Sequence, residues 1–271
     1  MIRPFLKWAG GKARLVECLR DQLGPGARLV EPFVGSAAVW LNTDFPSSLL
    51  ADANADLIRV YETLKTEGPS FIADCRRYFT PETNTAEAYY ALRDRFNETR
   101  DAREKAALFV YLNRHGYNGL CRYNASGLFN VPFGRYRRPY FPAAEMEAFW
   151  RKARRATFVV ADFRTVLASV RPGDVVYCDP PYVPLSSTAN FTDYAAAGFS
   201  WQDQEDLVCW AERLSAQGIR VVISNHATAW TRARYQNARQ LVVPVSRSIS
   251  CRGSQRRPVE EIVAVFDGRE G

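Results

Sequence analysis

Several features that would classify a protein quickly are missing from this chain of 271 residues. It has only two histidines, His115 and His226, and no C-x-x-C pair among its six cysteines. This composition offers no zinc-site spacing and disfavours a disulfide framework in a chain of this length. No apolar run approaches the length of a membrane span, and residues 1–7 lack the apolar core of a signal segment. We therefore expect a reduced, metal-free, cytoplasmic protein without membrane spans.

Positive charge is what the composition has in excess. The 36 Lys and Arg outnumber the 29 Asp and Glu, which gives a formal net charge of +7 and a sequence pI of about 9.2. Such an excess favours a polyanionic partner but does not identify it, because many basic proteins bind no polyanion. The length allows either one large domain or a domain with an insertion.

Short runs of β-branched and aliphatic residues alternate with helical patterns along much of the chain. One helical pattern is residues 201–217, where Leu207, Trp210, Ala211 and Leu214 fall on one face. Near-continuous apolar strands that alternate with helices predict a parallel-rich α/β sheet covered on both faces. The predicted strands are residues 28–31, 48–52, 157–162, 174–179, 219–224, 241–245 and 261–266.

Residues 54–145 interrupt this alternation. Three helical patterns, at 56–65, 85–96 and 102–113, precede the segment 114–140, which holds five arginines, six aromatic residues and no acid. Within it, residues 124–127 (Asn-Ala-Ser-Gly) are typical of a hairpin tip. Arginine and asparagine read base edges, and aromatic rings wedge into base stacks, so the segment favours a nucleic-acid interface. The alternative is a solvated loop. The same two readings apply to the basic stretch 247–257.

Four acids each end a predicted strand: Glu31, Asp52, Asp162 and Asp179. We expect them at one rim, because ligands of such sheets lie beyond the carboxyl ends of the strands. Asp52 stands where a carboxylate commonly binds ribose hydroxyls, although it could equally cap the next helix.

Two glycine-containing turns accompany these acids. Residues 31–38 form a tight strand-to-helix turn in which Gly35 would let a ligand approach the backbone, and residues 5–12 end in Gly-Gly-Lys before a helix. The second turn could bind an anion or simply cap the helix. Neither turn is a complete phosphate loop or dinucleotide fingerprint, which excludes nucleotide hydrolysis and counts against nicotinamide and flavin dinucleotides.

The tetrapeptide Asp-Pro-Pro-Tyr at 179–182 suits the alkylation of an amino group on an aromatic ring. Such a nitrogen is a poor nucleophile because its lone pair is delocalised into the ring. The carboxylate of Asp179 and the carbonyl of Pro180 could accept its two hydrogens and expose the lone pair, since paired prolines hold the chain stiff. Tyr182 offers a face on which a planar base could stack. Asp-Pro-Pro is also an ordinary strand exit.

The order of these blocks resembles the Dam family of DNA adenine-N6 methyltransferases. The matching blocks cover nearly the whole chain and are residues 5–12, 31–36, 49–52, 113–114, 117–124, 129–136, 175–182, 189–192, 223–226 and 247–250. The resemblance implies a Rossmann-like class I methyltransferase sheet with helices on both faces, plus an inserted helical and β-hairpin DNA-recognition domain. We expect residues 1–53 and 146–271 to form the catalytic domain and residues 54–145 the recognition domain.

The resemblance also implies the reaction and three sets of site residues. A monomeric, nucleoid-associated enzyme would use S-adenosylmethionine to methylate N6 of a flipped-out adenine in double-stranded DNA, within GATC. The residues implied in catalysis are Asp179, Pro180 and Tyr182. Those implied in binding the methyl donor are Trp8, Gly10, Lys12, Glu31, Phe33, Gly35, Asp52, Asp162, Phe163 and Asp179. Those implied in binding DNA are Lys7, Arg114, Tyr117, Asn118, Leu120, Arg122, Asn124, Asn130, Pro132, Arg135 and Tyr136.

One residue departs from the family's pattern. Ala37 replaces the second glycine of the usual Phe-x-Gly-x-Gly turn, and its Cβ either demands an unfavourable backbone angle or, inside a helix, costs little. We expect donor binding to survive, although weakened. Two alternatives remain: an amino methyltransferase acting on RNA or on protein glutamine, and a catalytically inactive sequence-specific DNA-binding relative.

Overall fold

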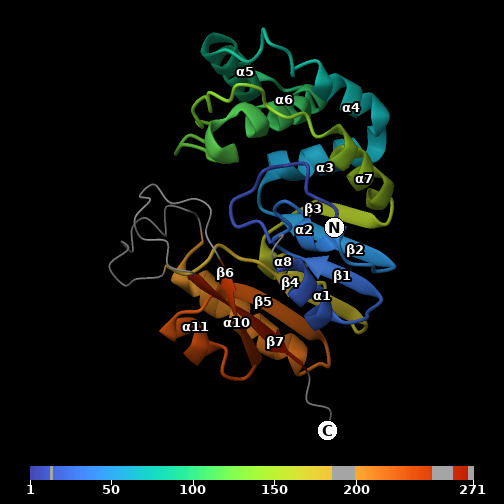
Figure 1. The fold of residues 1–271 in the computed structure, drawn as a ribbon. Helices are drawn as coiled ribbons and strands as arrows, with labels where there is room; N and C mark the ends of the chain where they lie inside the picture. The colour runs from blue at the N-terminus through green and yellow to red at the C-terminus, as the bar shows by residue number, and fades with distance from the viewer. Residues whose placement is uncertain (13–14, 185–198, 246–258, 268–271) are drawn as a thin grey trace. The chain divides into compact units, whose positions relative to one another are not determined.

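The computed structural model describes residues 1–12, 15–184, 199–245 and 259–267. The chain divides into two compact units (Figure 1). The first comprises Met1–Ala13, Val34–Asp44 and Asp52–Val160, and the second comprises Arg14–Phe33, Phe45–Ala51 and Ala161–Gly271. The blocks at 189–192 and 247–257 lie outside the described residues.

The second unit is built on a mixed sheet. Six strands of the seven-stranded sheet belong to it, in the order β2-β1-β4-β5-β7-β6. The first four pair in parallel, and β7 pairs antiparallel with both β5 and β6. This arrangement confirms the predicted Rossmann-like methyltransferase sheet. The strands are β1 Arg28–Glu31, β2 Ser47–Asp52, β4 Asp174–Cys178, β5 Arg220–His226, β6 Arg239–Val245 and β7 Val259–Phe266.

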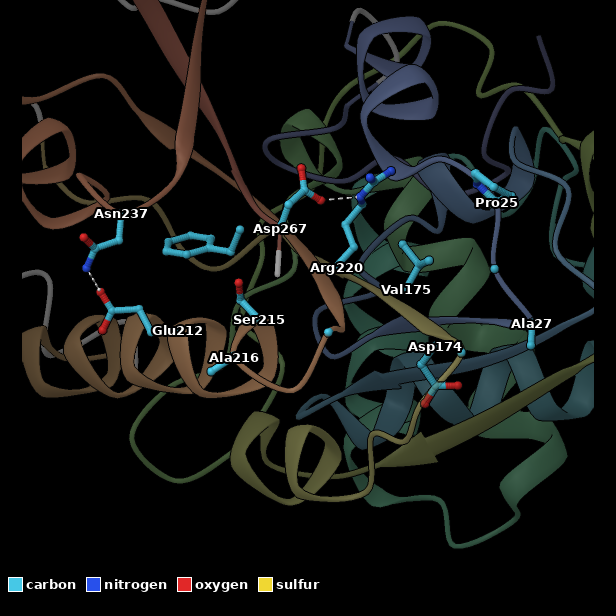
Figure 2. Close-up of a pocket in the computed structure, with 14 residues that line it drawn as sticks. Pro25, Ala27, Asp174, Val175, Glu212, Ser215, Ala216, Arg220, Asn237 and Asp267 are labelled. Carbon is cyan, nitrogen blue, oxygen red and sulfur yellow. Dashed lines mark hydrogen bonds and ion pairs between the residues drawn. The ribbon is translucent and has the colours of Figure 1, made fainter. Parts of the chain in front are cut away.

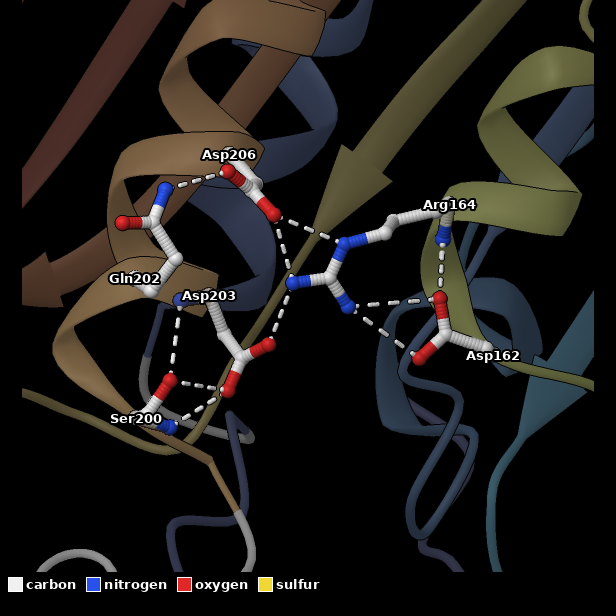
Figure 3. Close-up of polar contacts among 6 residues, drawn as sticks. All are labelled: Asp162, Arg164, Ser200, Gln202, Asp203 and Asp206. Carbon is white, nitrogen blue, oxygen red and sulfur yellow. Dashed lines mark hydrogen bonds and ion pairs between the residues drawn. The ribbon is translucent and has the colours of Figure 1, made fainter.

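Helices cover both faces of this sheet. α1 (Val16–Leu23) and α10 (Trp201–Ser215) both pack on β5, and they lie on opposite sides of the sheet in Figures 1 and 3. All five residues of β4 are buried as a result. The buried face of α10 includes Val208, whereas Trp210, which the sequence pattern placed there, is partly exposed. The unit also contains α8 (Phe163–Ala168) and α11 (Ala229–Arg234).

The first unit is mostly helical. Its centre is α6 (Ala102–His115), whose residues from Ala106 to Asn113 are all buried among α3, α4 and α5. The predicted helices agree with α3, α5 and α6, but two others were not predicted: α4, which follows the positive-φ Gly68 with a proline at its first position, and α7. The remaining elements are α2 Ala38–Leu41, α3 Ala55–Glu67, α4 Pro69–Arg76, α5 Ala86–Glu98, η1 Tyr117–Gly119, α7 Ala143–Ala153 and β3 Ala156–Val160.

Residues 116–136 form the predicted hairpin. Isolated antiparallel bridges join Gly116 to Phe133 and Tyr123 to Phe129. At the tip, the N–H of Gly127 donates to the carbonyl of Asn124 and Gly127 has a φ of 73°. Phe129 is buried against Phe96 and Tyr123. Part of the aromatic content of this segment therefore stabilises the hairpin itself. We call residues 116–136 the hairpin below.

Candidate active site

The acidic motif, residues 179–182, directly follows β4 in the second unit. β4 pairs with β1, which Glu31 ends, so two of the predicted rim acids follow neighbouring parallel strands. Both charges act on the buried hydroxyl of Tyr177: burial first, then the negative charges of Asp179 and Glu31, raise the pKa of this phenol well above its ordinary value. The predicted gathering of acids is present here for Glu31 and Asp179.

Asp179 is held by a hydroxyl of the neighbouring strand. The Oγ of Ser224, on β5, donates to Oδ1 of Asp179 over 2.9 Å and lies 2.9 Å from the hydroxyl of Tyr177. Ser224 is 0% exposed and Tyr177 is 2% exposed. The carboxylate is therefore fixed by a side chain of the sheet core.

Side chains from two elements fix the second half of the motif. Nε2 of Gln204, on α10, donates to the carbonyl of Pro181 over 2.7 Å. Asn225, on β5, accepts the N–H of Val183 over 3.0 Å and donates to Oε1 of Gln204 over 3.2 Å. Gln204 and Asn225 are both 0% exposed. Because they contact each other and the residues on either side of Tyr182, we call them the amide bracket.

Tyr182 lies between this bracket and β7. Its hydroxyl donates to Glu261 over 2.7 Å, and its ring meets the ring of His226 edge-on at 4.8 Å. Nδ1 of His226 lies 2.7 Å from the carbonyl of Val183, which can only accept, so this nitrogen carries a proton. Burial and then the charge of Asp179 raise the pKa of the Tyr182 phenol well above its ordinary value. Tyr182 therefore stays protonated and anchored at its tip.

Three phenylalanines form a cluster in the same unit. The ring centre of Phe33, after β1, lies 5.4 Å from that of Phe163, at the start of α8. It lies 5.6 Å from the ring centre of Phe199, just before α10. Phe163 and Phe199 are 5.5 Å apart and mostly buried. Phe33 and Phe163, both implied in donor binding, thus share one apolar wall, and Phe199 is a member that the sequence did not indicate.

Asp162 caps α8 and is not buried with the motif. Its Oδ1 accepts the N–H of Arg164 over 2.8 Å (Figure 3). Its side chain is 56% exposed. The guanidinium of Arg164 also binds Asp203 and Asp206 at the start of α10. Burial alone would raise the pKa of Asp203, but hydrogen bonds from Ser200 and Arg164 lower it overall. This ion network ties α8 to α10.

Asp52 organises the strand-to-helix turn in the first unit. Its Oδ2 accepts the N–H of Gly35 over 3.1 Å and its Oδ1 accepts the N–H of Asn54 over 2.9 Å. Burial raises the pKa of Asp52, against the lowering effect of these backbone hydrogen bonds. The hydroxyl of Tyr61 donates to the carbonyl of Gly35 over 2.5 Å. Asn54, rather than Asp52, provides the side-chain cap of α3.

Trp8 and Lys12 belong to the same part of the first unit. The ring of Trp8 lies against Gly35, where a Cβ would stand 2.8 Å from Nε1 of the indole. Only glycine fits there, and its φ of 45° favours glycine as well. Nζ of Lys12 donates to the carbonyl of Gly10 over 2.5 Å, and Lys12 is 5% exposed. The turn 31–38 and the segment 5–12 thus meet through Trp8.

Ala37 has the unfavourable backbone angle rather than a place inside a helix. It precedes α2 with a φ of 60° and a ψ of 26°, in the left-handed region, and is fully buried. It is therefore not inside the helix, and the missing glycine costs backbone strain.

Lys7 lies beneath the hairpin. A single buried amide holds its backbone, because Asn113 accepts the N–H of Lys7 over 2.8 Å and donates to its carbonyl over 2.7 Å. Its ammonium lies 4.1 Å from the ring centre of Tyr136, whose hydroxyl accepts the N–H of Asn118. Burial and then the charge of Arg114 lower the pKa of Lys7. Three residues implied in DNA binding are thereby connected.

Arg122 and Asn130 face each other across the hairpin. Nε of Arg122 donates to Oδ1 of Asn130 over 2.8 Å, and Nη2 donates to the carbonyl of Asn130 over 3.1 Å. The guanidinium is thus oriented although the residue is exposed. Asn124 instead serves the turn, since its Oδ1 accepts the N–H groups of Ser126 and Leu128.

The other residues implied in DNA binding differ in exposure. Arg114 donates to the carbonyls of Tyr140 and Phe5, so it supports the base of the hairpin. Tyr117 is 47% exposed, and its N–H donates to the carbonyl of Pro132. Pro132 and Arg135 are exposed and Leu120 is partly exposed. Asn118 and Arg135 have positive φ angles of 53° and 54°.

A cavity of about 1290 Å³ lies at the other end of β4 (Figure 2). It is lined by Asp174, which begins this strand five residues before Asp179, a separation of roughly 16 Å along a strand. Four of its polar side chains form two pairs, Arg220 with Asp267 and Asn237 with Glu212. The cavity is therefore separate from the acidic motif.

Sequence reasoning missed the residues that hold the motif: Tyr177, Gln204, Ser224, Asn225 and Glu261. One signal was available. Ser224 and Asn225 are polar residues that continue an apolar strand, and both are fully buried. Buried polar side chains require partners, so polar residues at the end of a central strand indicate a nearby site.

Comparison with known proteins identifies the family. The sequence profile described as D12 class N6 adenine-specific DNA methyltransferase matches residues 8–249. The chain belongs to this family. It is similar to a DNA adenine methylase of Vibrio cholerae, with 51% identity over 97% of this chain and 96% of that protein. DNA adenine methylases of Salmonella typhi and Escherichia coli are 52% and 50% identical, each over 97% of this chain and 95% of the relative.

Membership in this family establishes the class of reaction. The chain is an adenine-specific DNA methyltransferase, so it takes DNA as a substrate and needs a methyl donor. Among the described residues, no helix is long and apolar enough to cross a bilayer, and no group of three or more His, Cys, Asp or Glu side chains could hold a metal ion.

Proposed function

We propose that the chain transfers the methyl group of S-adenosylmethionine to N6 of adenine within GATC in duplex DNA, and that it acts as a monomer. One observation carries the proposal: the carboxylate of Asp179 is fixed at the end of β4, in the motif that suits an aromatic amine. Relatives that are 51% and 50% identical in sequence are named DNA adenine methylase, which supports adenine as the methyl acceptor.

The residues around Asp52 and the phenylalanine cluster fit the methyl donor. Asp52 is held by backbone N–H groups, those of Gly35 and Asn54 among them, and its carboxylate, with about four lone-pair sites, can still accept a ribose hydroxyl. The wall of Phe33 and Phe163 suits a planar base. S-adenosylmethionine supplies an electrophilic methyl group on a sulfonium. We assign its binding to the residues Trp8, Gly10, Lys12, Glu31, Phe33, Gly35, Asp52, Asp162, Phe163 and Asp179.

The motif residues would act on the amine as follows. As the bond from N6 to the methyl group forms, the bond from the methyl group to sulfur would break and leave a neutral thioether. Asp179 accepts one hydrogen of N6 and stabilises the positive charge that develops there, since a carboxylate is too weak a base to remove the proton first. N6 would then lose this proton to Asp179 or to water. Gln204 engages the carbonyl of Pro181, so we assign the second hydrogen to the carbonyl of Pro180. Tyr182 stacks on a base that has left the duplex. Catalysis then rests mainly on positioning.

The recognition role is assigned to residues 54–145, together with Lys7. The exposed ring of Tyr117 would enter the base stack, and the oriented guanidinium of Arg122 would read a base edge. Pro132, Leu120, Asn118 and Arg135 lie at the same hairpin. Arg114, Asn124, Asn130 and Tyr136 would support these contacts, because their side chains already bind other parts of the hairpin or its base.

Radiolabelled methyl transfer tests the function. The purified chain is given tritiated S-adenosylmethionine with a GATC duplex, with the same duplex whose GATC adenine is replaced by thymine, with an RNA of matching sequence, or with a glutamine peptide. Label should enter the first substrate only. Asp179→Ala should lower the rate at least about 1000-fold while the protein stays folded. The exposed Asp44 provides a control, and Asp44→Ala should keep the wild-type rate. Near-normal transfer by Asp179→Ala would refute the catalytic assignment.

A further inference from the structure

Two hydroxyl groups connect the core of the sheet to Asp179. The phenol of Tyr177 and Oγ of Ser224 are 2.9 Å apart, and Oγ lies 2.9 Å from Oδ1 of Asp179. Both hydroxyl-bearing residues are almost completely buried. Water therefore does not compete for these bonds, and hydrogen bonds in such surroundings are electrostatically strong.

The donors in this chain can be assigned by counting hydrogens. An ionised carboxylate only accepts, so the single hydrogen of the Ser224 hydroxyl points at Asp179. Ser224 then has no second hydrogen, and Tyr177 must be the donor between the two hydroxyls. Tyr177 keeps its proton, because burial and the charge of Asp179 raise the pKa of its phenol. The order of donation is Tyr177 to Ser224 to Asp179.

The sheet register brings these three residues together. β4 and β5 pair in parallel, with Cys178 opposite Ile223. The residues that follow them, Asp179 and Ser224, therefore lie side by side. Tyr177 and Asp179 are two residues apart and point to the same side. β5 continues to His226, beyond the end of β4, and pairs with β7 there. The backbone of Ser224 is thereby fixed, and its hydroxyl lies beside the motif.

We propose that Ser224 is a positioning residue for the methyl transfer, that its hydroxyl sets the orientation of the Asp179 carboxylate, and that Tyr177 acts through Ser224. The terminal torsion of an aspartate is broad, so each fixed donor narrows the range of orientations that the carboxylate samples. A reacting amine needs it within a fraction of an ångström and about 10–20° of one geometry. The inference rests on the proposed function and adds two residues to it.

Four proteins test the inference: wild type, Ser224→Ala, Tyr177→Phe and the double variant. Single-turnover methyl transfer to a GATC duplex is measured at saturating donor and DNA, together with the Kd of each. Ser224→Ala should slow the transfer step about 10- to 100-fold, and Tyr177→Phe about 3- to 10-fold. Both Kd values should stay within about 3-fold of wild type, because positioning changes the chemical step rather than binding.

The double variant separates a relay from two independent contacts. If Tyr177 acts through Ser224, the double variant is no slower than Ser224→Ala, within about 2-fold. Multiplication of the two single effects would overturn the relay. Ser48→Ala and Thr43→Val serve as controls, since Ser48 is a buried strand serine and the buried Thr43 donates its hydroxyl to the carbonyl of Val39. Both should transfer methyl groups at the wild-type rate.

The remaining outcomes are distinguishable. A Ser224→Ala rate equal to that of Ser48→Ala, beside an active wild type, overturns the inference and leaves the proposed function standing. Weakened donor or DNA binding with an unchanged transfer step makes Ser224 a binding residue and also overturns the inference. An inactive wild type overturns the proposed function, and the inference with it.

Discussion

The acidic motif and the hairpin are held in place by different means. In the motif, Asp179, Pro181 and Val183 each bind a buried side chain of β5 or α10. The hairpin is anchored at its base in a similar way, since the buried Tyr89 donates to the carbonyl of Val131. Its outer part is instead held by its own residues, such as Arg122 with Asn130 and Asn124 with Leu128. The difference teaches that the carboxylate of the acidic motif is fixed from the core, whereas the outer part of the hairpin, to which we assign recognition, is a loop whose residues can change without unfolding the protein.

The largest expected effect is the loss of the amide bracket. Asn225→Leu removes the partners of the Val183 N–H and the Gln204 amide, and these groups would stay buried. We expect the free energy of unfolding to fall by about 3 kcal/mol. Asn124→Leu, which removes two bonds at the exposed hairpin tip, should cost about 1 kcal/mol.

Urea unfolding of both variants checks this prediction. A cost for Asn124→Leu as large as that for Asn225→Leu would break the comparison, because the hairpin would then contribute to the core as much as the bracket does. The two unfolding free energies can be compared only if the slopes against urea concentration (the m-values) are equal. A change in m means that the unfolded or native state has changed its exposed surface.

The next largest effect concerns Arg122 in the hairpin. Arg122→Lys removes the fork that Asn130 orients, and lysine does not reproduce bidentate contacts. We expect the Kd for a GATC duplex to rise about 10-fold or more while the unfolding free energy stays within about 0.5 kcal/mol. Fluorescence anisotropy measures the Kd at fixed salt. Arg137→Lys, at an exposed arginine of the same segment, should change it by less than about 3-fold. Equal losses in the two variants would mean that Arg122 contributes only charge.

The smallest expected effect concerns positive φ angles. Asn118 and Arg135 have them in the exposed hairpin, and Ala37 has one in a buried turn. Ala37 has a φ of 60°, whereas Ala38 begins α2, and both are buried. Each change to glycine removes one buried methyl group. Because only Ala37→Gly relieves left-handed strain, it should be more stable than Ala38→Gly by about 1–2 kcal/mol. Thermal unfolding compares the two variants. Equal stability would show that the turn relaxes around Ala37.

The sequence predicted some parts of the molecule closely and others poorly, for physical reasons. Apolar and β-branched runs predicted all seven strands to within two residues. The central strands β4 and β5 have continuous apolar runs because both of their faces are buried, whereas the edge strands β3 and β6 are partly exposed. The helices α4 and α7 were missed, since they are short or follow irregular chain and depend on tertiary packing. Compact units also divide the chain differently from the expected domains. Residues 1–13 belong with the helical unit, through contacts such as those of Phe5 with Tyr61 and Phe149.

The site shows the same division. The motif at 179–182 and the arginine-rich hairpin were visible as local patterns, because their chemistry resides in consecutive residues. Ser224, Gln204 and Glu261 were not, because they contact the motif from 23 to 79 residues away in the chain.

The sequence by itself determined the strand-forming runs, the acidic motif and the membership in a methyltransferase family, since these depend on residue type and order along the chain. Only the tertiary structure decided which side chains orient Asp179, which arginine of the hairpin is oriented by an amide, and which backbone angle Ala37 adopts. The physical reason is that hydrogen bonds and burial depend on distances between residues far apart in the chain, and the pairing register of β4 with β5 sets those distances.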